Sequence, residues 1–396
     1  VQIRAGWESK GGYQLTLTGL GSTEGANLDF GDGRDQSEER AALGSDITNG
    51  LASARFEAPL SSRGTSTTIV SWYRNSERID FDGLLRNGAR SNAPDDAGAF
   101  GLSPIVFDRL ISVKDVSLRQ GVDYRLSDRH LVSLGVELHR LKSNVGLSIT
   151  GDRNPTEANG SSIQGGAGLP GALASTLNGT RGGLWVQDIY TPSQRMSFEP
   201  GVRLDWSTIN GGATLSPRLA GSYALGRGIR LRAAGGLYTQ SPGYEKLSQS
   251  DYFIDLSSPR ELGLRHEKAT HLVVGVEQEL PGDLTARVEG YHKRFQDLLV
   301  GRLETEGERL IRIARYDFPV LLRSSVPTAA QILSDPTNDA SGDAYGLDLF
   351  LMHNNAAAPL TGWLSYAWGH ANRQNYERRY AFEYERRHAF NAVGRY

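Results

Sequence analysis

Apolar and polar residues alternate along most of this chain with a period of two, which is the spacing of a β-strand with one apolar and one polar face. Near the N-terminus, Ile3 and Trp7 alternate with Arg4 and Glu8. A short polar, glycine-rich segment follows, and the alternation resumes at Tyr13, which is typical of a β-hairpin. Since no helical periodicity of comparable length competes with this pattern, the sequence predicts an all-β, antiparallel fold.

The same pattern returns often enough to predict about fifteen strands. We expect them at residues 1–8, 13–19, 51–58, 66–74, 114–126, 131–140, 183–190, 196–206, 216–225, 229–239, 269–280, 284–296, 343–352, 360–369 and 386–396.

The connections between these strands alternate between short and long. The short ones lie at residues 9–12, 60–64, 127–129, 191–194, 226–228, 281–283 and 353–359. The long ones lie at residues 20–50, 75–113, 141–182, 240–268, 297–342 and 370–385, with 207–215 the shortest of this set. Long loops without secondary structure are uncommon in compact soluble domains. Short periplasmic turns with long extracellular loops are typical of a transmembrane β-barrel of the outer membrane.

Composition excludes several other classes. The 396 residues include no cysteine, so disulfides, thiolate metal sites and cysteine nucleophiles are absent. The net charge of −2 argues against nucleic-acid binding. No apolar run reaches the ~18 residues of a membrane-spanning helix, whereas a barrel whose lumen is polar fits a hydrophobic content of 38 %.

The strand pattern also predicts that the barrel is incomplete at both ends. If the short turns are periplasmic, the first strand runs inward from the outside, so at least one strand is expected before Val1. Fifteen is an odd number, whereas bacterial single-chain barrels close with an even number, so further strands are expected after Tyr396. No targeting peptide follows Val1, and we therefore expect a mature or truncated segment.

Seven motifs in the second half of the chain occur in the order found in one known family. They are SPRLA at 216–220, RLRAAGGLY at 230–238 with SP at 241–242, LRHEKAT at 264–270, RVEGYHKRF at 287–295, AYGLDL at 344–349, GWLSYAW at 362–368 and YERRHAFN at 384–391. From about residue 183 onward the chain resembles the barrel of TonB-dependent outer-membrane receptors. Residues 1–182 resemble that barrel only in their general pattern of alternating strands, without specific motifs.

The resemblance implies a 22-stranded barrel, of which one strand would precede this chain and about six would follow it. Residues 1–396 would be a single, partial barrel domain in the outer membrane of a bacterial cell, in contact with outer-membrane lipid. The plug domain and the TonB box of the family are not found in the sequence. The implied function is active uptake of a scarce nutrient, such as an iron–siderophore, captured by extracellular loops. The implied energising partner is the inner-membrane protein TonB, acting through the missing plug region.

Two rival functions stay open at this stage. A passive porin or a secretion pore would share the barrel and need no plug. A soluble, extracellular all-β adhesin or carbohydrate-binding protein would share only the strands. No enzyme is predicted, because the chain contains no Gly-x-Ser-x-Gly nucleophile motif and no convincing pair of catalytic carboxylates.

No catalytic, cofactor-binding or metal-ligating residue is predicted, and the ligand-binding residues stay unknown. His266 and His271 are five residues apart, so they point to opposite faces of a strand and do not suggest a metal pair. The acidic stretch from Asp29 to Asp35 lacks the spacing of a helix-loop-helix calcium site. The glycine-rich segment 165–171 lacks the lysine of a phosphate-binding loop.

Aromatic residues near the predicted strand ends share a face with aliphatic residues. We expect them to lie at the membrane interface, where amphipathic rings are favoured, rather than to stack on a ligand. They are Trp7, Trp72, Tyr124, Trp206, Tyr223, Tyr366 and Trp368.

Overall fold

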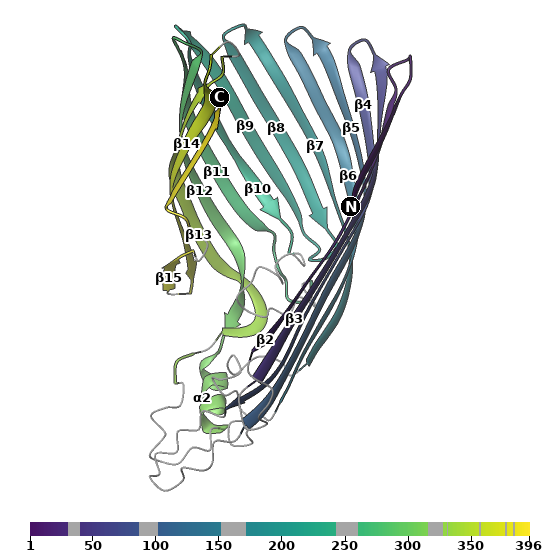
Figure 1. Ribbon diagram of the computed structural model, residues 1–396, viewed down its shortest axis with the longest axis vertical. Coiled ribbons are helices and arrows are strands. Elements are labelled where there is room, and N and C mark those ends of the chain that lie inside the picture. The colour runs from purple at the N-terminus through teal and green to yellow at the C-terminus, as the bar shows by residue number, and fades with distance from the viewer. Residues whose placement is uncertain are drawn as a thin grey trace.

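One antiparallel sheet of sixteen strands forms nearly all of the described structure (Figure 1). The computed structural model describes residues 1–30, 40–86, 102–151, 172–242, 260–315, 328–330, 332–355, 358–376, 378–382 and 385–396. Within these residues, no helix has the length and apolar character that crossing a membrane requires.

The elements follow one another along the chain with one short helix among them. They are β1 (Gln2–Glu8), β2 (Gln14–Phe30), β3 (Arg40–Ser61), β4 (Gly64–Arg86), β5 (Leu102–Ser127), β6 (His130–Gly151), β7 (Ala172–Ser193), β8 (Met196–Ser207), β9 (Ala213–Gly226), β10 (Ile229–Gln240), β11 (Glu267–Leu280), β12 (Leu284–Leu303), α2 (Glu306–Arg315), β13 (Ile332–His353), β14 (Thr361–Asn375), β15 (Arg378–Ala381) and β16 (His388–Arg395).

The strands form an up-and-down meander in which each pairs with its neighbour in sequence. The exception is β16, which pairs with β14 beside the four-residue β15. Six of the seven predicted short connections are confirmed as turns of two to five residues. The seventh, between His353 and Thr361, is longer, and part of it lies outside the described residues. In the turn between β9 and β10, Arg227 and Gly228 have φ of 53° and 75°, as a two-residue hairpin turn that matches the right-handed strand twist requires. The prediction of about fifteen strands misses only β15.

The register keeps the two faces of the sheet separate across many strands. One row of directly paired residues crosses eight strands on the apolar face: Met196, Tyr223, Leu231, Val276, Val288, Leu349, Tyr366 and Phe390. The neighbouring row on the opposite face is more polar: Arg230, Glu277, Arg287, Phe350, Ser365 and Asn391. A shift by one residue would exchange the two faces, so the alternation fixes the register.

The predicted long connections are wrong in extent, because strands occupy much of them. Strand β2 continues to Phe30, and the paired strands β4 and β5 run to Arg86 and from Leu102. The connection 297–342 contains the helix α2, which the sequence analysis did not predict. Consequently the long strands β2–β7 extend well beyond β8–β11 at the end of the sheet opposite the short turns (Figure 1).

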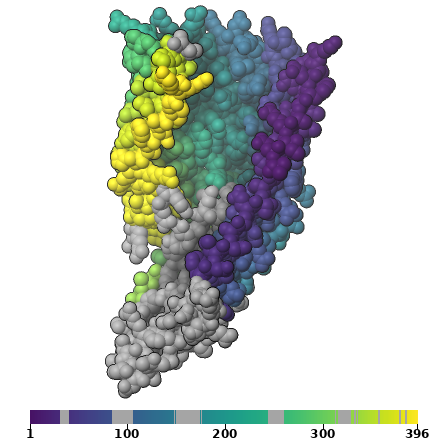
Figure 2. All heavy atoms as spheres, in the orientation of Figure 1, coloured from purple at the N-terminus to yellow at the C-terminus, as the bar shows by residue number. Residues whose placement is uncertain are grey.

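The sheet is strongly curved, and its concave side opens between the first and the last strands. Figure 2 shows this hollow between the purple N-terminal and yellow C-terminal strands, with teal and green strands behind it. Large apolar side chains remain exposed, such as Leu272 and Val274 at 55 % and 54 %. The few buried apolar residues lie away from the short turns; they include Ile111, Leu141, Ile209, Leu298 and Val300. The fold therefore has no central hydrophobic core in its described part.

Candidate functional site on the concave face

The polar face of the sheet is the concave one, because side chains of non-adjacent strands meet on it. A cavity of about 160 Å³ is lined by residues of β6, β7, β8 and β10 and by His266 before β11. Strands in a flat sheet are ~4.8 Å apart, so β6 and β10 would lie ~19 Å from each other. Only curvature toward this face brings their side chains around one cavity.

Opposite charges neutralise one another around this first cavity. The imidazole of His139 lies between two carboxylates, with Nδ1 2.7 Å from Asp115 and Nε2 2.7 Å from Glu137. A neutral imidazole has only one N–H, so both contacts are satisfied as donors only in the imidazolium. Arg203 donates to Asp205 at 2.7 Å and lies 3.7 Å from Glu137. The charged side chains beside this cavity are therefore held in ion pairs with one another.

Trp185 packs between two guanidinium groups of the same wall. The ring centre lies 4.9 Å from the guanidinium carbon of Arg119 and 5.6 Å from that of Arg203. Gly135, directly opposite Trp185 in the register, leaves room for the indole, because a Cβ there would lie 2.3 Å from the ring. The glycine and the two cations therefore fix the ring flat against the concave face.

A second and larger cavity, of about 560 Å³, lies on the concave side of β10–β14. It adjoins the first cavity, since Thr239 and Gln240 line both. Aromatic and histidine rings line it, as do three cationic side chains, those of Lys268, Lys293 and Arg373. Lys268 pairs with Asp297 at 2.9 Å. Its volume lies within the range of ~300–1,000 Å³ typical of small-molecule sites.

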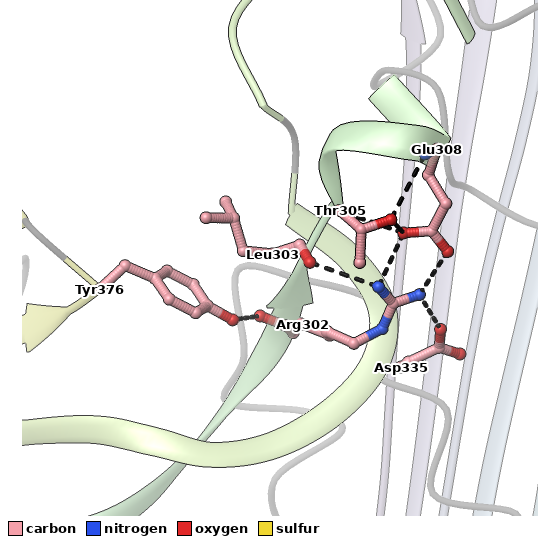
Figure 3. A network of polar contacts seen from close by, with 7 residues as sticks. Arg302, Leu303, Thr305, Glu308, Asp335 and Tyr376 are labelled. Carbon is pink, nitrogen blue, oxygen red and sulfur yellow. Dashed lines mark hydrogen bonds and ion pairs between the residues drawn. The ribbon is translucent and has the colours of Figure 1, made fainter. Parts of the chain in front are cut away.

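A polar network lies at the end of the sheet opposite the short turns (Figure 3). Arg302, near the end of β12, donates to both carboxylate oxygens of Glu308 at 2.8 and 2.9 Å and to Asp335 at 3.1 Å. Thr305 and Glu308 form a capping box, in which the Glu308 carboxylate accepts from the Thr305 N–H at 2.9 Å. Tyr376 donates to the carbonyl of Gly301. The network joins β12, α2, β13 and the end of β14.

The charge of Arg302 also sets the ionisation of Glu308. The hydrogen bonds from Arg302, reinforced by those from Thr305, lower the pKa of Glu308 to about 2. The carboxylate therefore stays ionised well into the acidic range and keeps α2 joined to β12.

The residues weighed in the sequence analysis lie apart in the structure. His266 is buried, with its Nδ1 3.3 Å from the side-chain nitrogen of Asn210, whereas His271 stacks on Tyr238. Asp29 is exposed one residue before the end of β2, and residues 31–35 of the acidic stretch lie outside the described residues. The glycine-rich segment 165–171 lies outside them as well.

The register places three of the aromatic residues opposite leucines of the aliphatic face, and their expected location at the membrane interface stays a prediction. Trp7 pairs with Leu15, Tyr223 with Leu231, and Tyr366 with Leu349. The prediction missed the rings of the concave face, such as Tyr238 and Tyr291. The sequence did contain a signal for Tyr291, because it lies two residues from the charged Lys293, on the other side of His292, and therefore on the same face of the strand.

The sequence matches the family model described as TonB dependent receptor-like, beta-barrel, over residues 5–396. No curated protein matches the sequence significantly.

Solved structures show the same fold at low identity. The ferric-catecholate import receptor Fiu of Escherichia coli K12, in its closed form, aligns with a TM-score of 0.60 at 12 % identity, over 100 % of this chain and 66 % of Fiu. The RagAB peptide importer aligns in its closed-closed state with a TM-score of 0.53 at 12 % identity, over 94 % of this chain and 45 % of that one. In its open-open state the TM-score is 0.52 at 13 % identity, over 95 % and 46 %. The chain thus spans about half to two thirds of these proteins. By the family match along nearly its whole length, it belongs to the TonB-dependent receptor β-barrel family.

Proposed function

We propose that this chain forms the wall of an outer-membrane receptor that actively takes up a scarce, small nutrient. The observation that carries the proposal is the two-faced curved sheet, because its exposed apolar face suits lipid and its polar concave face suits an aqueous lumen. In water, an exposed apolar surface of this extent would be an aggregation hazard. Family membership adds energised transport to this picture.

The related structures support small solutes as the cargo, without choosing among them. Fiu is named as an importer of ferric catecholates, and RagAB as a peptide importer. An iron–siderophore complex or a similar small ligand is the cargo proposed here, captured by the long loops. In this proposal residues 1–396 are one partial barrel domain, and a plug that couples to TonB belongs to the rest of the protein.

An uptake assay with an uncoupler tests the proposal. Cells with and without the gene are given radioactive iron complexed to catecholate or hydroxamate siderophores, before and after a protonophore. We expect the protein in the outer-membrane fraction and uptake that depends both on the gene and on the proton gradient. Gene-dependent uptake that survives the protonophore would instead indicate a passive pore. Recovery of the protein in the soluble fraction would contradict both.

A further inference from the structure

The larger cavity has a floor of small residues. Gly342 and Ala344 of β13 lie beside Ala371 of β14 on the concave face. Next to them, Tyr291 lies flat across both strands, because a Cβ on Gly346 or Gly369 would lie 2.6 or 2.8 Å from its hydroxyl oxygen. Small residues at these positions keep the cavity open.

Rings form one side of the cavity. Tyr238 and His271 stack with their centres 4.5 Å apart, and Phe295 meets the edge of His271 at 6.4 Å. These three side chains come from β10, β11 and β12, so they make a continuous apolar wall beside the floor. Such a wall suits the flat face of an aromatic ligand.

Two half-buried cations flank the floor without a carboxylate partner among the described residues. Lys293 lies over the ring of Tyr291, with its side-chain nitrogen 5.3 Å from the ring centre. The guanidinium carbon of Arg373 lies 5.7 Å from the ring centre of Phe382. This differs from the first cavity, where ion pairs hold the charges of His139 and Arg203.

The acidic residues near the floor are already engaged. Buried Glu267 accepts from the backbone N–H of Leu299 at 2.9 Å, and Asp343 lies 3.7 Å from His292 and 3.9 Å from Arg379. The lining carries three cationic side chains, Lys268, Lys293 and Arg373, against these two carboxylates, so positive charge is in excess.

The register gives the spacing of the two cations. Lys293 pairs with Ala344, which pairs with Ala371, and Arg373 lies two residues further along that strand. With strands ~4.8 Å apart and a rise of ~3.3 Å per residue, the two Cα atoms are about 12 Å from each other. A ligand with two anionic groups on one flat ring system can reach both cations.

We propose that this cavity is a binding site for a small aromatic anion, with Lys293 and Arg373 holding its acidic groups and the Tyr238–His271–Phe295 wall holding its ring. The proposal deepens the proposed function, since it names a ligand class and a ligand site on the barrel wall. It rests on that function only in treating the ligand as cargo.

Binding of the trisulfonated dye pyranine to the full-length protein in detergent tests the site. Pyranine carries several sulfonates on a flat ring system, and its fluorescence anisotropy reports binding. We expect saturable binding that weakens roughly tenfold in Lys293→Gln and again in Arg373→Gln, because each removes a charge-assisted hydrogen bond. Ala344→Leu should also weaken binding by filling the floor. The cationic dye proflavine should not compete.

Arg294→Gln is the matched control, because Arg294 is the next residue on β12 and lies on the opposite face. It should leave pyranine binding unchanged. Equal loss in Arg294→Gln and Lys293→Gln, or no saturable binding to a protein that shows a heat-modifiable barrel band, would overturn the site. Such a result would leave the proposed function standing if uptake is still gene-dependent and energised. Conversely, pyranine binding by a protein without uptake would support the site and contradict the proposed function.

Discussion

The two faces of the sheet use opposite means to stabilise their side chains. On the convex face, Leu272 and Val274 are more than half exposed and have only their strand neighbours beside them. On the concave face, the side chains of Asp115 and His139 are 15 % and 17 % exposed and are joined by an ion pair. The concave face is satisfied by the protein itself, whereas the convex face needs an apolar surrounding. The proposed function accounts for this difference, with lipid outside the sheet and an aqueous lumen inside it.

The largest effect is expected when a charge is placed on the convex face. Leu134 of β6 is 47 % exposed on that face, and Leu134→Arg should cost roughly 2–4 kcal/mol of folding free energy if it lies near the bilayer midplane. The measurement is the urea-induced unfolding of the barrel in lipid vesicles.

Ser133→Arg serves as the control, because Ser133 is the adjacent residue on the concave face, where it donates to Asp123. It should be tolerated. Comparable losses at both positions would mean that the two faces are not different environments.

A smaller loss is expected when the packing of the concave face is disturbed. Gly135→Val would place a Cβ 2.3 Å from the Trp185 ring and 2.4 Å from the backbone oxygen of Gln120, so it should cost about 1–3 kcal/mol. Gly19→Ala is the control, since no atom lies within 4 Å of the added Cβ. The same urea titration compares them, and a stable Gly135→Val barrel would show that the indole is not held there.

The smallest effect is expected beyond the two faces, in the network of Figure 3. Because Arg302 lowers the pKa of Glu308 from 4.5 to about 2, ionised Glu308 stabilises the joint between β12 and α2. That contribution is complete above pH 4.5 and is lost as the pH falls toward 2. Amide hydrogen exchange should show α2 losing protection over this range while β11 keeps it. In Glu308→Gln, the protection of the α2 amides, corrected for their intrinsic exchange rates, should no longer change over this pH range.

The sequence predicted the strands where one face of the sheet is apolar and the other polar, because that contrast produces the alternation. It missed the continuation of β2 from Leu20 to Phe30, in which every residue from Thr23 onward is exposed and no contrast between the faces arises. The helix α2 was missed although Thr305 and Glu308 have the spacing of a capping box. It lies within the predicted long connection 297–342, and its ten residues give fewer than three turns of helical periodicity.

The candidate binding cavity could not be predicted, because its parts are distant in sequence. Lys293 and Arg373 are 80 positions apart, and only the register of β12, β13 and β14 places them on either side of one floor. The identity of each residue as cationic was visible. The lack of an acidic partner nearby depends on the fold.

The most direct test of the two-faced wall is a cysteine scan of β11, which is possible because the chain has no cysteine of its own. Single cysteines replace Leu272, Val273, Val274, Val276 and Glu277, and each is labelled with bimane in the full-length protein in vesicles. We predict that brominated lipid quenches the label at 272, 274 and 276, while water-soluble iodide quenches it at 273 and 277. Quenching by lipid at all five positions, or at none, would contradict a strand with one face in the membrane and the other lining a lumen.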